Sequence, residues 1–180
     1  MRATSTILKS KTLTLKELKS SDVTQQYVDW LNDPDVNKYL EPSDNPHTLD
    51  TITNYIKVNK RSKHNYLYGI FVEDIHVGNI KIGDVNKNHD TAEIGYLIGN
   101  KDYWGKGIAS EAIRQIIKLS IHKYGLAKIS AGVYEGNIAS ERVLRKCGFS
   151  QEGRRKSHVQ IDGKRRDYIL YGSVLKEYLQ

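Results

Sequence analysis

The stretch WGKGIA at residues 104–109 combines residue types that can bind a phosphate through the backbone. Gly105 and Gly107 let the chain approach a ligand closely, and the first N–H groups of the helix expected after them can hold a pyrophosphate. The signal is weak alone, because a strand-to-helix turn with two glycines also forms without a ligand. The stretch lacks the Gly-Lys-Ser/Thr ending of a Walker loop and follows strands expected to be antiparallel, so it fits neither a nucleoside triphosphatase nor a Rossmann site.

The cysteine and histidine content argues against several other classes of site. Cys147 is the single cysteine, which excludes an internal disulfide and a cysteine-rich metal site. It precedes Gly148 at an expected helix end and has no adjacent histidine, so a buried structural thiol is favoured over a nucleophile. The six histidines show no ligand spacing, and no metal site is predicted.

Positive charge is concentrated near the C-terminus. The chain has 28 lysines and arginines against 21 acidic residues, a net charge of +7, and residues 154–166 hold six of the basic residues. This segment, Arg154 to Arg166, either binds an anionic acceptor or is a solvated charged hairpin. His158 within it is either a base or a solvated strand residue. General nucleic-acid binding is not expected, because it usually spreads basic and aromatic residues over a wider face.

Hydrophobic periodicity predicts the elements that must position these residues. Leu13, Leu15 and Leu18 alternate with polar residues as in a strand, and the residues after position 22 have helical spacing. All three prolines lie within residues 32–47, which favours loop or short turns. Strands are predicted at 10–18, 66–74, 75–85, 91–99, 128–136, 149–160 and 166–173, and helices after residue 22 and at 48–62, 105–124 and 137–146.

The order of these elements, β-α-α-β-β-β-α-β-α-β-β, indicates an α+β fold. No repeat or composition break divides the 180 residues, so a single domain over 1–180 is expected. The longest apolar stretch, 66–72, is far shorter than the ~20 residues of a membrane span. The first 15 residues lack the apolar core of a secretory signal. A cytoplasmic protein with no membrane partner is expected.

Three segments together resemble the GCN5-related N-acetyltransferase (GNAT) superfamily, and within it the ribosomal-protein N-terminal acetyltransferase (RimJ/RimL-like) subgroup. EIGYLIGNKDYWGKGIASEAI is similar to the subgroup's strand, pyrophosphate loop and helix, NIASERVLRKCGF to its following helix, and WLNDPDVNKYL to its N-terminal segment. The resemblance covers residues 10–178. The family pattern Gln/Arg-x-x-Gly-x-Gly/Ala falls on Trp104, Gly107 and Ala109, with Trp104 in place of the usual Gln or Arg.

The resemblance implies a mostly antiparallel, twisted sheet flanked by helices, whose fourth and fifth strands splay apart to admit acetyl-coenzyme A (acetyl-CoA). The pantetheine arm would pair with the fourth strand, and the amide of Leu97 or Ile98 would polarise the thioester carbonyl. Asn137 matches a position that often contacts the cofactor. The implied cofactor-binding residues are Tyr96, Leu97, Ile98, Trp104, Gly105, Lys106, Gly107, Ile108, Ala109, Ser110 and Asn137.

The resemblance also implies catalytic groups. Glu93 precedes Gly107 by a spacing similar to that of the base glutamate in the family's histone acetyltransferases, so it is the expected general base. A structural carboxylate, or one that only binds the acceptor ammonium, is the alternative. The tyrosine that often serves as general acid is replaced by Leu144, which leaves Tyr134 and Ser140 as candidates.

Two aromatic residues flank the proline-rich segment, which in the family helps to cover the acceptor. These are Trp30 and Tyr39, although core packing explains Trp30 better.

These observations predict an enzyme that transfers acetyl from acetyl-CoA to a primary amine by direct attack on the thioester. The acceptor is either a protein N-terminal amine or a small-molecule amine such as an amino sugar on a nucleotide carrier, and the basic segment argues against a polyamine. An acetyl-CoA-binding module with little turnover and a ribosome- or RNA-associated protein are the alternatives. Dimers are frequent in the family, so a homodimer is left open.

Overall fold

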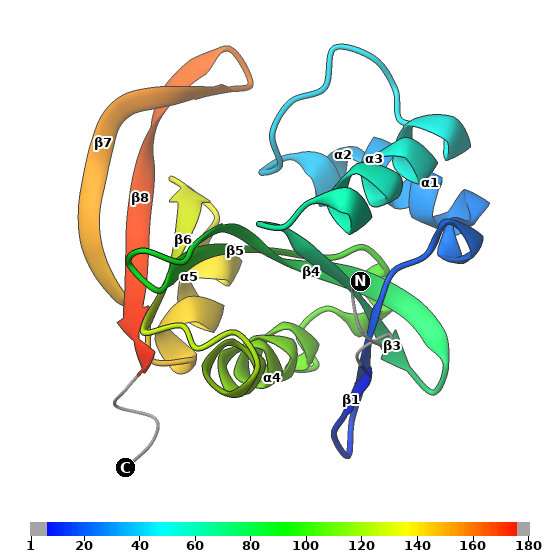
Figure 1. The fold of residues 1–180 in the computed structure, drawn as a ribbon. Helices are drawn as coiled ribbons and strands as arrows, with labels where there is room; N and C mark the ends of the chain where they lie inside the picture. The colour runs from blue at the N-terminus through cyan, green and yellow to red at the C-terminus, as the bar shows by residue number, and fades with distance from the viewer. Residues whose placement is uncertain (1–6, 176–180) are drawn as a thin grey trace.

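Residues 7–175, the part of the chain that the computed structural model describes, form a sheet of eight strands with helices on both faces (Figure 1). The ends of the predicted domain, 1–6 and 176–180, lie outside the described residues. The strands are β1 (Ile7–Lys9), β2 (Thr14–Glu17), β3 (Tyr66–Val72), β4 (Ile75–Asn86), β5 (Thr91–Ile98), β6 (Lys128–Tyr134), β7 (Ser150–Ile161) and β8 (Lys164–Val174). The helices are α1 (Gln25–Asn32), α2 (Pro34–Asn37), α3 (Leu49–Arg61), α4 (Ile108–His122) and α5 (Ile138–Lys146), with 3₁₀ turns η1 (Ser20–Asp22) and η2 (Lys101–Tyr103).

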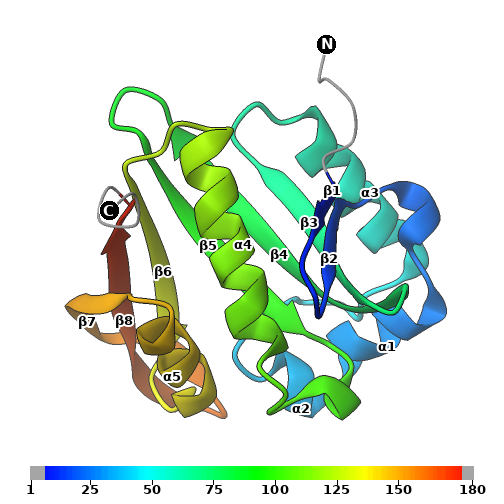
Figure 2. The same cartoon turned by 90° about the horizontal axis from the view of Figure 1, so that it is seen from below.

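The strands lie in the order β1-β2-β3-β4-β5-β6-β8-β7, and each neighbouring pair is antiparallel except β5 and β6. The parallel pairing is short: it begins at Thr91 and Lys128 and ends at Glu93 and Ser130. Beyond these residues the two strands diverge, as Figure 2 shows from below. The predicted α+β fold is confirmed, as is the splay between the fourth and fifth predicted strands, here β5 and β6.

Two hydrophobic clusters hold the helices on opposite faces of the sheet. On one face, α4 buries a stripe that includes Ile113 and Ile116 against the strands, where Ile94 of β5 is also buried. On the other face, Trp30 of α1 and Ile56 of α3 pack in a second cluster with residues of β3. Burying a side chain of this kind contributes about 1.5–3 kcal/mol. The packing of α4 across the sheet therefore keeps its N-terminus beside the end of β5.

The structure contains two short elements that the predicted order lacks. The strand predicted over 10–18 is shorter and pairs with the additional strand β1, through a turn in which the N–H of Ser10 donates to the carbonyl of Leu13. The proline-rich segment holds α2, because Asp33 caps it and Pro34 occupies its first position, where an N–H is not needed. The remaining elements, including the hairpin around Asp162, agree with the prediction.

Candidate active site

The turn between β5 and α4 presents backbone N–H groups at the start of a long helix. Gly105 and Gly107 have φ angles of 71° and 78°, a region that glycine adopts without strain. Gly107 is the N-cap of α4 and makes no side-chain capping bond, so the N–H groups of Ile108, Ala109 and Ser110 can bind an anion. A side chain built at either glycine would meet no atom within 4 Å. The turn therefore borders open space that suits a phosphate group.

The side chain of Trp104 folds back onto the end of β5. Its indole Nε1 donates a hydrogen bond of 2.7 Å to the carbonyl oxygen of Ile98, and 44% of the residue remains exposed. Trp104 thus caps the strand edge at Ile98, and its indole N–H is not among the groups that can bind an anion at the turn.

Hydrogen bonds at the end of β5 show which backbone groups face the opening between β5 and β6. The N–H of Gly99 donates to the carbonyl of Val77 on β4 at 2.9 Å. Successive residues of a strand turn their N–H and C=O groups to opposite sides, so the N–H of Leu97 also points toward β4. Those of Tyr96 and Ile98 point into the opening. Of the two amides predicted to polarise a thioester, Ile98 is therefore the one with the suitable direction.

Two hydroxyl groups meet on the α5 side of the opening. The hydroxyl of Tyr96 lies 2.6 Å from Oγ of Ser140. Burial raises the pKa of Tyr96 to about 12, so the phenol keeps its proton at neutral pH. Asn137, the N-cap of α5, accepts a hydrogen bond from the N–H of Ser140 through its side-chain oxygen. Asn137 thereby positions Ser140 as well as the start of the helix.

A cavity of about 1130 Å³ lies on the other face, between the α1–α3 layer, the strands and the tip of the β7–β8 hairpin. Gly95, Tyr96 and Leu97 line it from β5, and Tyr134 lines it from β6. The loop between α2 and α3 contributes Glu41, whose Oε2 accepts a hydrogen bond of 2.6 Å from the Tyr134 hydroxyl. The same stretch of β5 therefore borders both the opening and the cavity.

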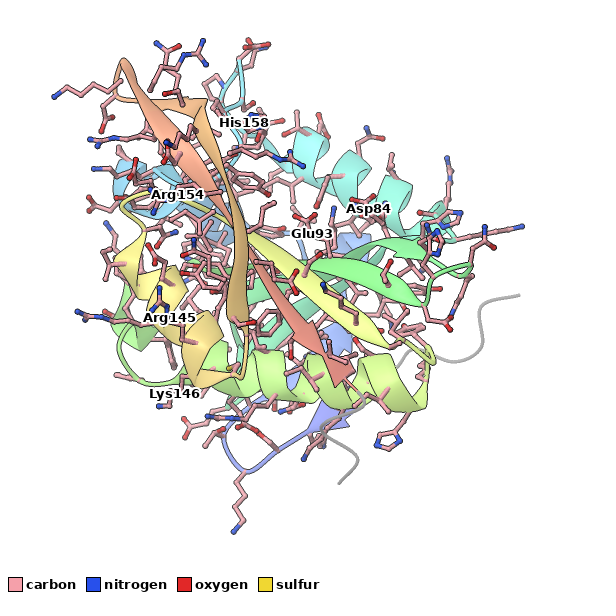
Figure 3. The ribbon with its side chains drawn as sticks, turned by 90° about the vertical axis from the view of Figure 1, so that its left-hand side faces the viewer. Asp84, Glu93, Arg145, Lys146, Arg154 and His158 are labelled. Carbon is pink, nitrogen blue, oxygen red and sulfur yellow. The ribbon has the colours of Figure 1, made fainter. Side chains whose placement is uncertain are left out.

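Glu93 lies on β5 at the last residue that pairs with β6, on the strand side that Gly95 also occupies. Figure 3 shows it on the side of the sheet that carries His158, away from Arg145 of α5. Its Oε1 accepts a long hydrogen bond of 3.4 Å from the hydroxyl of Tyr168 on β8. Glu93 is exposed and stands outside the cavity lining, so it can reach an acceptor there only through an intervening group.

A comparison with known families decides the class of this site. Residues 12–150 match the family described as Acetyltransferase (GNAT) domain. The chain belongs to the GNAT acetyltransferase family. The match includes the glycine turn, the β5–β6 opening and α5, whereas nearly all of the β7–β8 hairpin lies beyond it.

Similar proteins share the GNAT domain over almost the whole chain. The chain is 30% identical over 171 residues to an uncharacterized N-acetyltransferase, p20, of Bacillus licheniformis, covering 93% of this chain and 94% of that protein. Spermidine N-acetyltransferase of Vibrio cholerae, solved with CoA and spermine, gives a TM-score of 0.86 at 20% identity and covers 95% and 100% of the two chains. RimL, a ribosomal L7/L12 alpha-N-protein acetyltransferase solved with coenzyme A, gives 0.85 at 19% identity and covers 94% and 98%. The predicted family is confirmed.

A buried leucine, Leu144, occupies the position of the tyrosine that the family resemblance implies as general acid. Leu144 is 0% exposed and packs in the core under the sheet, so it has no proton to give. Cys147 is 3% exposed, its thiol donates to the carbonyl of Ser110 at 3.4 Å, and burial raises its pKa. This environment suits a structural thiol rather than a nucleophile.

The two aromatic residues beside the proline-rich segment have different surroundings. Trp30 is buried in the α1–α3 cluster and lies against Gly99, where a Cβ would collide with the indole at 2.3 Å. Core packing therefore explains Trp30. The hydroxyl of Tyr39 donates to the carbonyl of Gly136 at 3.0 Å, which ties the start of the α2–α3 loop to the end of β6.

The basic residues of the hairpin are not equivalent. Arg154 forms ion pairs with Asp167 at 2.8 Å and with Glu135 at 3.3 Å, so its charge is used within the protein. The tip of the hairpin, residues 160–162, lines the cavity. These three residues carry no positive charge, so an anionic part of an acceptor would meet the basic residues of the hairpin only beyond the cavity lining.

Sequence reasoning missed Glu41. The residue lies in the proline-rich segment, where no period or motif marks it, and its partner Tyr134 is 93 positions away. A carboxylate directly before Pro42 was the only sign that this loop carries a charged group at a defined place.

Within residues 7–175, no group of three or more His, Cys, Asp or Glu side chains is placed to hold a metal ion. No helix in this range is both long and apolar enough to cross a membrane.

Proposed function

We propose that this GNAT domain transfers an acetyl group from acetyl-CoA to a primary amine. One observation supports this most strongly: the same stretch of β5, residues 95–98, faces the opening beside the glycine turn and borders the cavity on the other face. A thioester held from one side and an amine held from the other would meet at this stretch. Direct transfer requires such a meeting of the two reactants.

The groups for the donor are mainly backbone. The N–H groups of Ile108, Ala109 and Ser110 would hold the pyrophosphate, and residues 105–107 leave the space for it. The pantetheine arm would lie along residues 96–98. Trp104 already bonds to the carbonyl of Ile98. The arm would therefore have the N–H groups of Tyr96 and Ile98 and the carbonyl of Tyr96 as its partners.

Transfer needs a neutral amine, a group that stabilises negative charge on the thioester oxygen, and a proton for the leaving thiolate. The N–H of Ile98 stabilises the charge. The hydroxyl pair of Ser140 and Tyr96 supplies the proton. Glu93 accepts the proton of the amine through water, since it stands four residues before Leu97, about 13 Å along the strand.

The acceptor we propose is a protein N-terminal amine or a small-molecule amine such as an amino sugar on a nucleotide carrier. The two solved neighbours are named for spermidine, a small amine, and for a ribosomal protein, a large one. The basic hairpin beside the cavity disfavours a polycation and favours an acceptor that carries negative charge away from its amine.

A panel of acceptors tests the proposal, with release of free thiol from acetyl-CoA as the measurement. The panel contains peptides with free N-termini, nucleotide-linked amino sugars and polyamines, each beside its N-acetylated form as a control. We expect thiol release with at least one free amine and none above background with its acetylated form. Binding of acetyl-CoA without release for any amine would instead identify a binding module, the candidate that Leu144 at the acid position favours.

A further inference from the structure

The carboxylate of Glu41 is a charged group of the cavity that is hydrogen-bonded to a strand residue of its wall. It comes from the α2–α3 loop, and its Oε2 accepts a hydrogen bond of 2.6 Å from the Tyr134 hydroxyl. We propose that Glu41, held by Tyr134, is the subsite that binds the ammonium of the acceptor and thereby selects for cationic amines at the transfer point. This inference rests on the proposed function and names a binding group that its catalytic scheme lacks.

The position of Tyr134 along the sheet places this pair at the transfer point. The last pair between the parallel strands is Glu93 with Ser130, and counting four residues onward from each gives Leu97 and Tyr134. These two residues stand at the same height on the two sides of the opening, and both line the cavity. An amine at Glu41 is therefore beside the strand segment whose amide faces a thioester.

Glu41 is held in place before any acceptor arrives. The hydroxyl of Tyr39 is bonded to the carbonyl of Gly136 at 3.0 Å. Lys38 pairs with Asp162 at the hairpin tip at 3.6 Å. These two contacts attach the chain just before Glu41 to the end of β6 and to the β7–β8 hairpin. A carboxylate fixed in this way loses little freedom on binding a cation.

Glu41 also has free capacity for an ammonium. Among the described residues, Tyr134 is the hydrogen-bond donor to this carboxylate, and Oε1 receives none. Burial and the bond to Glu41 raise the pKa of Tyr134, so the phenol keeps its proton and stays a donor. Lys81 of β4 also lines the cavity, and its side chain folds over Gly83, the residue that pairs with Glu93.

The test compares Glu41→Gln with Asp44→Asn, which removes the same charge three residues later in the same loop. The probe is a tripeptide amide with a free N-terminus, and its N-acetylated form lacks the ammonium. We expect Glu41→Gln to raise the acceptor KM roughly ten-fold or more, the scale of a lost charged hydrogen bond, with a much smaller change in kcat. Asp44→Asn should change KM by less than about three-fold.

A second variant separates binding from folding. Tyr134→Phe keeps the Glu41 charge but frees its side chain, so we expect a smaller rise in KM, with unaltered CoA affinity and melting temperature. Equal KM values for Glu41→Gln and Asp44→Asn would overturn the inference while leaving acetyl transfer intact. If wild type releases no thiol with any amine of the acceptor panel, the proposed function fails instead. The inference is then judged by calorimetry of the tripeptide on CoA-loaded protein, where binding that is absent or insensitive to Glu41→Gln overturns it.

Discussion

The two sides of the β5–β6 opening are built from different kinds of chemical group. On the cofactor side, the donors are backbone N–H groups at the start of α4, placed by two glycines with positive φ. On the acceptor side, the groups are side chains, and two carboxylates there each accept a hydrogen bond from a tyrosine: Glu41 from Tyr134 and Glu93 from Tyr168. Backbone donors persist when neighbouring side chains change, whereas one substitution can alter the acceptor side.

This difference explains where variation can occur. Trp104 stands where the family has Gln or Arg, yet the turn keeps its N–H groups, because the tryptophan bonds to Ile98 rather than to the anion-binding backbone. The family match ends at residue 150, and the hairpin that lines the cavity follows it. The hairpin tip, residues 160–162, is the part of the cavity lining that lies outside the family match.

The largest effect is expected from a change on the cofactor side. Gly107→Glu places a side chain and a negative charge in the anion-binding turn, so it should abolish the thermal stabilisation that acetyl-CoA gives to wild type. A ligand at 100 times its Kd stabilises a protein by about 2.7 kcal/mol, roughly 5–10 °C for a domain of this size. Differential scanning fluorimetry with and without acetyl-CoA measures the shift.

The matched control for Gly107→Glu is Gly125→Glu, just beyond the other end of α4. Gly125 also has a positive φ, 63°, and a Cβ there would meet no atom within 4 Å. The two variants share the backbone strain, but only the first fills the turn. The turn is not the donor site if acetyl-CoA fails to stabilise Gly125→Glu as well, or if it still stabilises Gly107→Glu. The proposed difference between the two sides of the opening would then be wrong.

The next effect concerns a side chain of the acceptor side. If Glu93 takes the amine proton through water, Glu93→Gln should lower kcat by roughly 10² with little change in CoA affinity. Higher pH should partly restore the rate, because the fraction of neutral amine then grows without a base. The measurement is the pH profile of kcat for wild type and variant.

Tyr168→Phe is the companion variant for Glu93. It removes the 3.4 Å bond to the carboxylate but leaves the carboxylate in place, so its kcat should fall far less than that of Glu93→Gln. A lower melting temperature with near-normal kcat in Glu93→Gln would assign Glu93 a structural role. Bulk water would then be the proton acceptor. Glu41 would be the only one of these two carboxylates with a proposed role toward the acceptor.

The cofactor side could be predicted from the sequence because its parts are neighbours in the chain. Residues 96–110 contain the strand edge, the glycines and the first turn of α4, and local rules of backbone conformation connect them. The direction of the Ile98 amide needed the structure, since it depends on the bond between Gly99 and Val77 of another strand. The family resemblance implied the amide of Leu97 or Ile98 without choosing between them.

The acceptor side could not be predicted in the same way because its residues meet only after folding. Glu41 and Tyr134 come from a loop and a strand 93 positions apart, and loops carry no period. The short helix α2 was missed for a related reason: prolines begin helices as well as interrupt them. The hairpin was predicted, but the ion pair that occupies Arg154 was not, because Asp167 lies on the opposite strand.

The smallest effect is expected in the layer that supports the acceptor side, at His76 of β4. Its ring packs against Tyr27, Trp30 and Phe71, with centroid distances of 5.3, 5.2 and 4.8 Å. Its Nε2 lies 2.9 Å from the side-chain oxygen of Asn79 and therefore carries the proton. Nδ1 is buried without a hydrogen-bond partner among the described residues. A second proton would place a charge in this aromatic surrounding.

Burial accordingly lowers the pKa of His76 below the usual histidine value, although its bonds to Asn79 and to the carbonyl of Gly78 oppose the shift. Above about pH 6.5, the ring is neutral in both the folded and the unfolded chain, and the free energy of unfolding does not depend on it. As the pH falls below that value, the unfolded chain binds a proton that the folded chain does not. Stability then decreases by up to about 1.4 kcal/mol per pH unit until the folded pKa is reached.

Chemical denaturation between pH 7 and pH 5 tests this linkage. His76→Gln lowers stability at neutral pH through lost packing, but it should also flatten the decrease toward pH 5, because the titrating group is gone. The exposed His89 provides the control, since His89→Gln leaves the buried ring in place and should keep the wild-type slope. Equal slopes in all three proteins would show that His76 accepts its proton as readily folded as unfolded. Protonation of His76 would then not lower the stability of the layer that supports the acceptor side.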